Sequence, residues 1–280
     1  MKRYRPTSKS RRGMTTISFG DFVTTNDPHK SLTHGFKRGM GRNHHGKVTT
    51  RHKGGGHKRL FREIDFRYDK IDVPYTIKSV EYDPNRSGFI GLAQYQDGAK
   101  RYVLLPQSVK VGDVRVTSSN AEQKPGNRLQ LKNINTGTFL YNVEVKPQGG
   151  AKLGRSAGNY VELIAKDAGM VDVKLPSTEV RKVKDTAWAS IGEVSNNENR
   201  LVNLGKAGRS RWLGIKPTVR GTAQNPVDHP HGGGEGRQGR GRKRAISVYG
   251  KPTGKGQKSR TPKKYSNKFI VSRRKVGKRK

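Results

Sequence analysis

Apolar and polar residues alternate along two central stretches of the chain, which is the pattern of half-buried β-strands. In the first stretch the period of two runs from Ile64 through Tyr68 and from Val73 to Ile77, and Val80 then falls on the opposite phase. Short apolar runs follow at 89–95, 101–105 and 114–116, separated by turn sequences such as Asp97-Gly98. Five short strands in about 60 residues predict a small closed barrel of the OB-like kind.

A second set of short apolar runs predicts another five-stranded barrel further along the chain. These runs cover 139–145, 160–165, 171–175, 179–183 and 187–194, and turn sequences rich in Pro, Gly and Asp separate them. No long amphipathic helix is predicted, although a short helix fits the region 196–212. The chain is therefore predicted to be mainly β, with two small β-barrels joined around 118–136.

Charge is distributed very unevenly along the chain. The 280 residues include 59 Lys+Arg against 21 Asp+Glu, a formal net charge of +38. Residues 1–60 contribute +13 and residues 206–280 contribute +21, whereas 61–130 and 131–205 contribute only +2 each. We therefore divide the chain into a basic N-terminal extension (1–60), an OB-like barrel (61–130), a second barrel (131–205) and a basic, Gly-rich C-terminal extension (206–280).

The two long basic extensions are too polar to fold by burying apolar surface alone. We expect them to become ordered on a partner rather than in the free protein. A net charge of +38 requires an anionic partner, and a polymer of phosphates is the simplest one. Gly is interleaved with Lys and Arg in both extensions, which lets the backbone approach a phosphate chain closely. The extensions are therefore predicted to bind nucleic acid.

Composition excludes several other classes of protein. The chain has no Cys, which excludes disulfides, thiolate zinc sites and iron–sulfur clusters. No apolar run approaches the ~18 residues of a membrane span. The basic N-terminal residues also lack the apolar stretch of a secretory signal. We expect no membrane partner and no cofactor or metal of the protein's own, with Mg²⁺ present only through a bound RNA.

The run GGAKLGRS (149–156) nearly matches the phosphate-binding loop of nucleotide hydrolases. Arg155 stands where that loop requires Lys, and the run lies between two predicted strands rather than between a strand and a helix. We therefore interpret it as a hairpin loop and exclude nucleotide hydrolysis. Lys152 and Arg155 could still contact an RNA backbone.

Two further runs combine glycines with cations. The run RHKGGGHKR (51–59) is typical of a segment that follows a phosphate backbone, and GKAGRSRWLG (205–214) adds an aromatic ring, Trp212. This ring could stack on a base or pack on a barrel, and the sequence leaves both open. A metal cluster of His44, His45, His52 and His57 is conceivable, but their spacing does not specify one.

The run NPVDHPHGGGEGR (225–237) allows three interpretations. His229 and His231 could ligate a metal, but a third ligand is not evident and the surrounding cations oppose a divalent ion. His229 could also be a general base oriented by Asp228. We favour a third interpretation, a rigid loop in which the prolines fix φ and Gly232–Gly234 allow close approach to another chain. The histidines then hydrogen-bond phosphates or base edges.

The candidate RNA-binding residues are polar, cationic, aromatic or glycine positions within or beside these runs. They are Arg51, His52, Lys53, Gly54, Gly55, Gly56, His57, Lys58, Arg59, Lys152, Arg155, Lys206, Arg209, Arg211, Trp212, Lys216, Arg220, Asn225, Asp228, His229, His231, Gly232, Gly233, Gly234, Arg237, Arg240 and Arg242.

Four of these segments, in order along the chain, resemble signature segments of the universal ribosomal protein L-two family of the large ribosomal subunit. They are RHKGGGHKR (51–59), LGRSAGNYVELIAKD (153–167), LGKAGRSRWLGIKPTVRG (204–221) and NPVDHPHGGGEGR (225–237). The length and the opening residues, KRYRPTS followed by RRGMT, resemble the bacterial type. The chain departs from that type at Gln224, where Met is usual, and at AISVYG (245–250).

The resemblance implies an OB-like barrel followed by an SH3-like barrel. It further implies a structural protein of the large subunit, in the cytoplasm, that is a primary binder of 23S rRNA near the peptidyl transferase centre. The implied neighbours are other large-subunit proteins, tRNA, and the small subunit at an intersubunit bridge. The implied roles are support of subunit association, tRNA binding and peptide-bond formation. His229 matches the family histidine suspected of a part in peptidyl transfer.

Two rival functions remain at this point. Direct catalysis through His229 would make the protein an enzyme, but peptide-bond formation depends mostly on positioning, which an RNA scaffold can supply. Compaction of DNA would fit the charge, but it explains neither the two barrels nor the motifs. We therefore expect a structural RNA-binding protein and not an enzyme.

Overall fold

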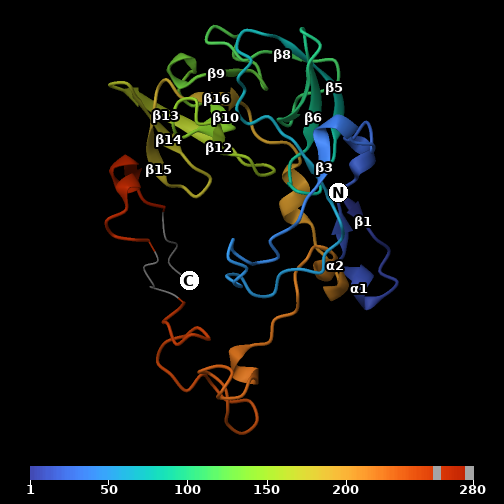
Figure 1. Ribbon diagram of the computed structural model, residues 1–280, viewed down its shortest axis with the longest axis vertical. Helices are drawn as coiled ribbons and strands as arrows, with labels where there is room; N and C mark the ends of the chain where they lie inside the picture. The colour runs from blue at the N-terminus through green and yellow to red at the C-terminus, as the bar shows by residue number, and fades with distance from the viewer. Residues whose placement is uncertain (255–259, 275–280) are drawn as a thin grey trace. The chain divides into compact units, whose positions relative to one another are not determined.

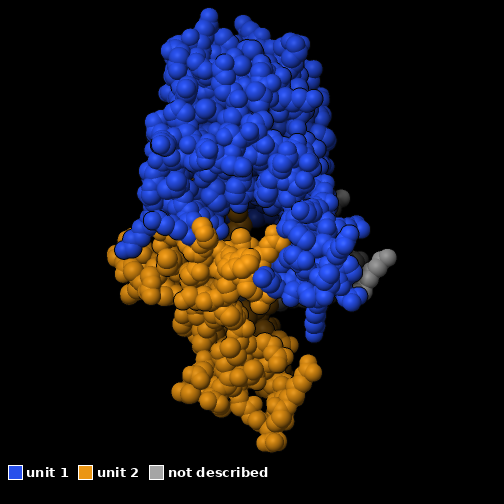
Figure 2. Space-filling model, turned by 90° about the vertical axis from the view of Figure 1, so that its right-hand side faces the viewer, with its two compact units in different colours: residues 1–37, 58–206, 266–280 blue, residues 38–57, 207–265 orange. Residues whose placement is uncertain are grey.

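The computed structural model describes residues 1–254 and 260–274, and their regular structure is mainly β (Figure 1). The chain forms two compact units (Figure 2). Unit 1 consists of Met1–Lys37, Lys58–Lys206 and Ser266–Lys280, and unit 2 of Arg38–His57 and Ala207–Tyr265. Both predicted β domains belong to unit 1. Residues 255–259 and 275–280 of the predicted C-terminal extension lie outside the described residues.

The OB-like domain is built on a four-stranded antiparallel sheet in the order β7-β6-β5-β8. Its strands are β5 (Tyr75–Glu81), β6 (Ile90–Tyr95), β7 (Lys100–Leu104) and β8 (Val114–Arg115). The register of β5 against β6 shifts between Ile77 and Ser79. Such a bulge exchanges the inward and outward faces of a strand. Ile77 is therefore buried before it and Val80 after it, which confirms the predicted change of phase.

The prediction of a strand from Ile64 to Tyr68 is wrong. Ile64 makes only an isolated bridge to Tyr102. Asp65 Oδ1 accepts hydrogen bonds from the backbone N–H groups of Arg67 (2.9 Å) and Tyr68 (2.8 Å). An aspartate that bonds its own following backbone favours a turn over a strand. The apolar side chains of this segment are therefore placed by a turn.

Part of the N-terminal segment is built into the OB-like domain. Ile17 is buried in the same apolar cluster as Ile77 and Phe89, and Val23 packs against that cluster. The Thr24 N–H donates to the Val80 carbonyl (2.9 Å). The expectation that residues 1–60 order only on a partner is therefore wrong for the segment around Ile17–Thr24, because its few apolar side chains complete the barrel core.

The remaining N-terminal elements are short. They are β1 (Lys2–Arg3) paired with β2 (Thr15–Thr16), helix α1 (Lys9–Arg12), 3₁₀ helices at Phe19–Asp21 and Lys30–Leu32, and β3 (Thr33–Gly35) paired with β4 (Leu60–Arg62).

The SH3-like domain contains a seven-stranded antiparallel sheet in the order β17-β15-β14-β13-β10-β16-β9 (Figure 1). Its strands are β9 (Arg128–Gln130), β10 (Phe139–Tyr141), β13 (Val161–Asp167), β14 (Met170–Lys174), β15 (Val180–Lys184), β16 (Trp188–Ile191) and β17 (Ile270–Ser272). A separate hairpin of β11 (Val143–Glu144) and β12 (Ala151–Leu153) comes between β10 and β13 in the sequence. Two 3₁₀ helices cover Leu131–Asn133 and Asn197–Leu201. The predicted runs are thus confirmed, but β9 and β17 come from outside 131–205.

The two β domains share a buried polar cluster around Arg128. The Arg128 side chain is 1% exposed, and its Nη2 donates to Glu144 Oε1 (3.1 Å) while its Nη1 donates to the Asn142 carbonyl (2.8 Å). The Tyr68 ring of the OB-like domain lies 4.5 Å from the guanidinium carbon. Tyr68 Oη in turn accepts from Asn142 Nδ2 (2.8 Å). A charge buried this completely requires all of these partners.

We expect the Arg128–Glu144 pair to carry a large share of the stability of unit 1. Glu144→Gln keeps the size of the side chain but leaves Arg128 buried without its counter-charge. The free energy of unfolding should fall by about 3–5 kcal/mol, measured by urea denaturation of the full chain. Lys174→Ala removes an exposed pair with Glu162 (2.8 Å) and should leave the free energy of unfolding almost unchanged. Similar losses in the two variants would contradict this assignment.

A second prediction concerns stability at high pH. Burial raises the pKa of Tyr68 from 10.0 to about 12. The unfolded chain therefore releases this proton at lower pH than the folded chain. The contribution of Tyr68 to stability is complete below pH 10 and is lost as the pH rises through about 12. Tyr68→Phe should reduce the fall in unfolding free energy across this range by up to about 1.4 kcal/mol per pH unit. An unchanged pH slope in urea denaturation would rule this out.

Candidate nucleic-acid interface

Unit 2 concentrates positive charge without an apolar core. Its segments 38–57 and 207–265 contain 20 Lys and Arg but only two acids, Asp228 and Glu235. The buried apolar clusters found among the described residues all belong to unit 1. In unit 2 the large apolar side chains are instead exposed, among them Met40, Trp212 and Val227. Backbone hydrogen bonds therefore have to supply most of its structure.

The two Gly-and-cation runs predicted from the sequence lie side by side in unit 2. Three backbone hydrogen bonds join them: Gly54 N–H to the Gly214 carbonyl (2.9 Å), Lys216 N–H to the His52 carbonyl (3.0 Å) and His57 N–H to the Trp212 carbonyl (3.0 Å). Lys53 and Ile215 form an antiparallel bridge within this pairing. We call residues 51–57 and 212–216 together the glycine pairing.

Glycine is required in this pairing because the two backbones are so close. A Cβ at Gly56 would lie 2.7 Å from the backbone nitrogen of Gly214 and 2.9 Å from the Trp212 carbonyl oxygen. Gly214, with a φ of +89°, also follows helix α2 (Ala207–Trp212), where its N–H bonds the Arg211 carbonyl (2.9 Å). A left-handed glycine commonly ends a helix in this way.

The side chains around the glycine pairing are exposed to solvent. Four cationic side chains here are exposed, those of Arg51, Lys53, Arg211 and Lys216. The Trp212 side chain is 58% exposed, which favours stacking on a base over packing on a barrel. Stacking on a base stays a prediction, and the exposed ring among cations fits it.

Arg38 and Arg42 also belong to this region but are absent from our sequence-based candidates. Arg38 Nη2 donates to the Gly56 carbonyl (2.8 Å), and Arg42 Nη1 donates to the Gly46 carbonyl (2.9 Å). The signal was available, because GFKRGMGRNHHGK (35–47) interleaves glycines and cations like the runs we selected.

His229 is buried within its own loop. Its exposed fraction is 9%, and a Cβ at Gly221 would lie 2.6 Å from the imidazole ring. The backbone N–H of His231 donates to His229 Nδ1 (3.0 Å). This nitrogen must therefore be unprotonated, and the neutral ring carries its hydrogen on Nε2.

His231 has a similar role two residues further along the chain. Its Nε2 accepts a hydrogen bond from the Ile246 N–H (3.0 Å), and the two imidazole centroids are 4.7 Å apart. Partial desolvation lowers the pKa of His231 below its usual 6.5, and the positive charges of Arg240 and Arg242 lower it further. The neutral form, which can accept the Ile246 hydrogen bond, is thereby favoured.

The glycines of this loop let the chain fold back on itself. A Cβ at Gly232 would lie 2.4 Å from the carbonyl oxygens of Gln224 and Asn225. Gly233 and Gly234 have φ values of +87° and +98°. Together with Pro230, Arg240 and Arg242 they line a shallow hollow that faces solvent. These glycines thus give the loop the close backbone approach that we predicted, here to the chain's own residues 224 and 225.

Asp228 and His229 are both described, and no side-chain hydrogen bond joins them. The described part of the chain also contains no group of three or more His, Cys, Asp or Glu residues placed to hold a metal ion. None of the described helices has the length and apolar character that crossing a membrane requires.

The other candidate residues divide between the two units. Arg220, Asn225, Asp228 and Arg237 are exposed in unit 2, and the cations Lys58 and Lys206 are exposed in unit 1. Arg59 donates to the Pro84 carbonyl (2.6 Å) in unit 1. The partly buried Arg209 lies in α2.

The run 149–156 also lies in unit 1. It contains strand β12, which pairs with β11 in a hairpin, so the run is partly strand and not wholly the loop that we predicted. Lys152 is exposed, while the Arg155 guanidinium lies 4.5 Å from the Phe66 ring centroid.

Two protein-family models match this chain. The model described as "Ribosomal Proteins L2, RNA binding N-terminal domain" matches residues 29–117, which span β3 to β8. The model described as "Ribosomal Proteins L2, C-terminal domain" matches residues 124–250, which span β9 to β16, helix α2 and the loop 225–237 with His229 and His231, here called the histidine loop. Both matches follow the order of the OB-like and SH3-like domains. The chain therefore belongs to the ribosomal protein L2 family and is a structural, RNA-binding protein of the large ribosomal subunit.

Proposed function

We propose that this protein is a primary binder of 23S rRNA near the peptidyl transferase centre, and that it organises RNA there without taking part in the chemistry. The proposal includes support of subunit association, tRNA binding and peptide-bond formation. Its neighbours would be other large-subunit proteins, tRNA, and the small subunit at a bridge, in cytoplasmic ribosomes. The observation that carries the proposal is the charge of unit 2, whose segments hold 20 Lys and Arg against two acids, together with the exposed cations beside its glycine pairing.

Unit 2 has the physical properties of an RNA-binding segment. Its glycine pairing brings two backbones together and leaves cationic side chains exposed on both of them. Each cation that meets a phosphate releases a condensed counterion, which favours binding. Trp212 would stack on an unpaired base beside these phosphate contacts. We therefore assign RNA binding chiefly to the basic parts of 1–60 and 206–280, and scaffolding to the two β domains.

The geometry of His229 supports a structural role over catalysis. A general base needs an unprotonated nitrogen that faces the proton to be removed. In His229 that nitrogen is Nδ1, and it already accepts the His231 N–H (3.0 Å). The remaining Nε2–H is a donor, suited to a phosphate or a carbonyl oxygen. His229 would therefore hold the loop in shape and donate one hydrogen bond to RNA.

The salt dependence of binding tests the assignment of RNA contacts to unit 2. The triple variant Arg51→Gln/Lys53→Gln/Lys216→Gln removes three exposed cations beside the glycine pairing. If each contacts one phosphate, the slope of log K against log salt should decrease by about 2–3. The measurement is filter binding of 23S rRNA over a series of KCl concentrations.

A matched variant controls for total charge. Lys124→Gln/Lys174→Gln/Lys184→Gln removes three exposed cations from unit 1, two of which are paired with carboxylates. Its slope should stay close to that of the unchanged protein. An equal decrease in both variants would show that total charge, and not unit 2, determines the affinity.

Two substitutions at His229 separate structure from catalysis. His229→Ala removes the acceptor for the His231 N–H and should reduce the yield of assembled large subunits. The Oδ1 atom of His229→Asn can accept the same hydrogen bond, so this variant should restore assembly although an amide is no general base. Single-turnover peptide-bond formation on purified particles should stay within about tenfold of normal for both. A loss of about 10²–10⁴-fold with intact particles would favour catalysis by His229.

A further inference from the structure

A two-stranded ribbon in unit 1 carries aromatic side chains that belong to none of the buried apolar clusters found among the described residues. Strands β3 and β4 pair with His34 opposite Phe61 (Figure 1). The Phe61 ring centroid lies 5.1 Å from that of His34 and 5.6 Å from that of Phe36, so the three rings form one cluster. We call residues 33–37 and 58–63 together the aromatic ribbon.

The register of the aromatic ribbon turns these rings towards solvent. Side chains alternate between the two faces of a strand, so the neighbouring pair, Thr33 and Arg62, lies on the opposite face. Arg62 is buried there, with its Nη1 3.9 Å from the Asp83 carboxylate. Phe36 by contrast remains 38% exposed and Phe61 36% exposed. Exposed aromatic rings on paired strands are a surface on which unpaired bases stack.

The charge around the aromatic ribbon favours a polyanion. Segments 29–37 and 58–63 contain five Lys and Arg against one acid, Glu63. Three lysines of these segments are exposed, Lys30, Lys37 and Lys58. The Glu63 carboxylate lies 3.4 Å from His34 Nδ1, within the ribbon itself. The exposed lysines thus outnumber the acid, and the phosphates on either side of a stacked base would be attracted.

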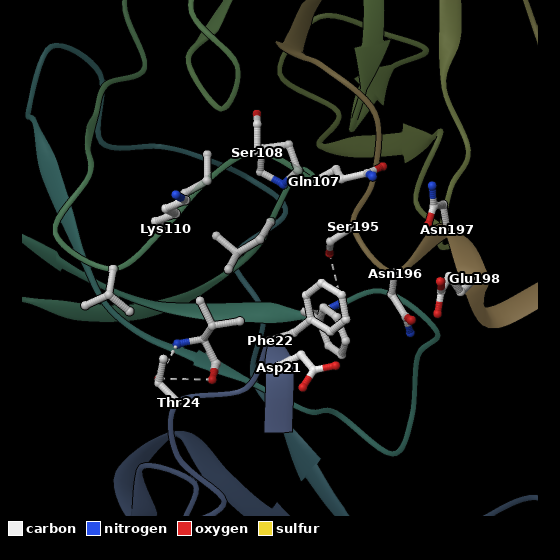
Figure 3. A pocket seen from close by; sticks show the side chains of 16 residues that line it. Asp21, Phe22, Thr24, Gln107, Ser108, Lys110, Ser195, Asn196, Asn197 and Glu198 are labelled. Carbon is white, nitrogen blue, oxygen red and sulfur yellow. Dashed lines mark hydrogen bonds between the residues drawn. The ribbon is translucent and has the colours of Figure 1, made fainter. Parts of the chain in front are cut away.

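Another exposed ring of unit 1 lacks this excess of cations. Phe22, 52% exposed, borders an open hollow (Figure 3). Glu198 in this hollow pairs with the Met1 ammonium group (2.9 Å). The other charged residues of the lining, Asp21 and Lys110, offset each other. The hollow therefore has no excess charge that would attract RNA.

The rings of Phe139 and Tyr160 in the SH3-like domain provide a closer comparison. They are 45% and 38% exposed, and their centroids lie 4.3 Å apart. Phe139 lies opposite Glu162 in the sheet, and Glu162 pairs with Lys174 (2.8 Å). These two rings match those of the aromatic ribbon in exposure but have a balanced ion pair beside them, so they serve as a control.

We propose that the aromatic ribbon is a further RNA-binding site, which stacks an unpaired base on Phe36 and Phe61 and holds the neighbouring phosphates with its lysines. This inference rests on the proposed function, because it takes rRNA as the partner. It adds a site in unit 1 at which aromatic stacking supplies much of the affinity. In unit 2 the cations supply most of it.

The salt dependence of binding distinguishes the two kinds of contact. A phosphate contact releases counterions and steepens the slope of log K against log salt, whereas loss of a stacked ring leaves this slope unchanged. Phe36→Leu/Phe61→Leu keeps apolar side chains but removes both rings. We expect the full-length variant to bind 23S rRNA about 5- to 150-fold more weakly at every KCl concentration in filter binding, with an unaltered slope.

Two further variants control for folding and for the loss of exposed rings in general. Phe36→Tyr/Phe61→Tyr keeps both rings and should bind within about twofold of the unchanged protein. Phe139→Leu/Tyr160→Leu removes two rings of similar exposure and should not alter the affinity.

Ultraviolet crosslinking examines the same contact in the unchanged protein. Irradiation of its complex with 23S rRNA, followed by mass spectrometry of the peptides, should find a nucleotide attached to Phe36 or Phe61. Phe139 and Tyr160 should carry none.

Four results would overturn the proposal. They are an affinity that survives the loss of both ribbon rings, an equal loss in the two leucine variants, a loss that tyrosine does not restore, or no nucleotide on either phenylalanine. The first of these would leave the aromatic ribbon to a protein contact. Failure of the RNA-binding assignment to unit 2 would appear instead as an unchanged salt slope in Arg51→Gln/Lys53→Gln/Lys216→Gln, so the two failures are distinguishable.

Discussion

One buried charge constrains how the two β domains fit together. Removing the Arg128 guanidinium from water costs several kcal/mol unless nearly every donor finds an acceptor. Those acceptors are the Asn142 carbonyl, Glu144 and the Trp188 carbonyl, with the Tyr68 ring packed against the cation. They come from three places in the SH3-like domain and from a turn of the OB-like domain. The hydrogen-bond acceptors all lie in the SH3-like domain, as Arg128 itself does on β9, so the Tyr68 ring and its hydrogen bond with Asn142 are what tie this cluster to the OB-like domain.

Unit 2 is stabilised in a different way. It has few buried side chains, and its described segments are joined by backbone hydrogen bonds between glycine-rich stretches. A Cβ at Gly56 or Gly232 would collide with the facing backbone, so side chains are excluded from these contacts and point away from them. This arrangement presents many cations per residue. These cations also repel one another, and a bound polyanion reduces this repulsion. The scaffold and the RNA-binding surface thus rest on different interactions, apolar burial in one and backbone pairing in the other.

These two modes differ in how much the sequence reveals. Strands such as β6 and β14 were predictable because burial requires alternating apolar residues. The three-residue strands β9 and β17 carry too little pattern to be recognised, and Asp65 replaced a predicted strand by a turn. For the interface, composition identified most of the cationic runs. It could not show that residues 51–57 pair with 212–216, because a glycine permits a close approach of backbones without indicating which other segment approaches.

The histidine loop shows why imidazoles suit so cationic a unit. A loop that folds back on itself needs acceptors for its own N–H groups. A carboxylate in that position would pair with the surrounding arginines and compete with phosphate for them, whereas a neutral imidazole accepts one hydrogen bond and adds no charge. His229 Nδ1 and His231 Nε2 do this for the N–H groups of His231 and Ile246. The lowered pKa of His231 keeps that ring neutral, so the arginines remain available to RNA.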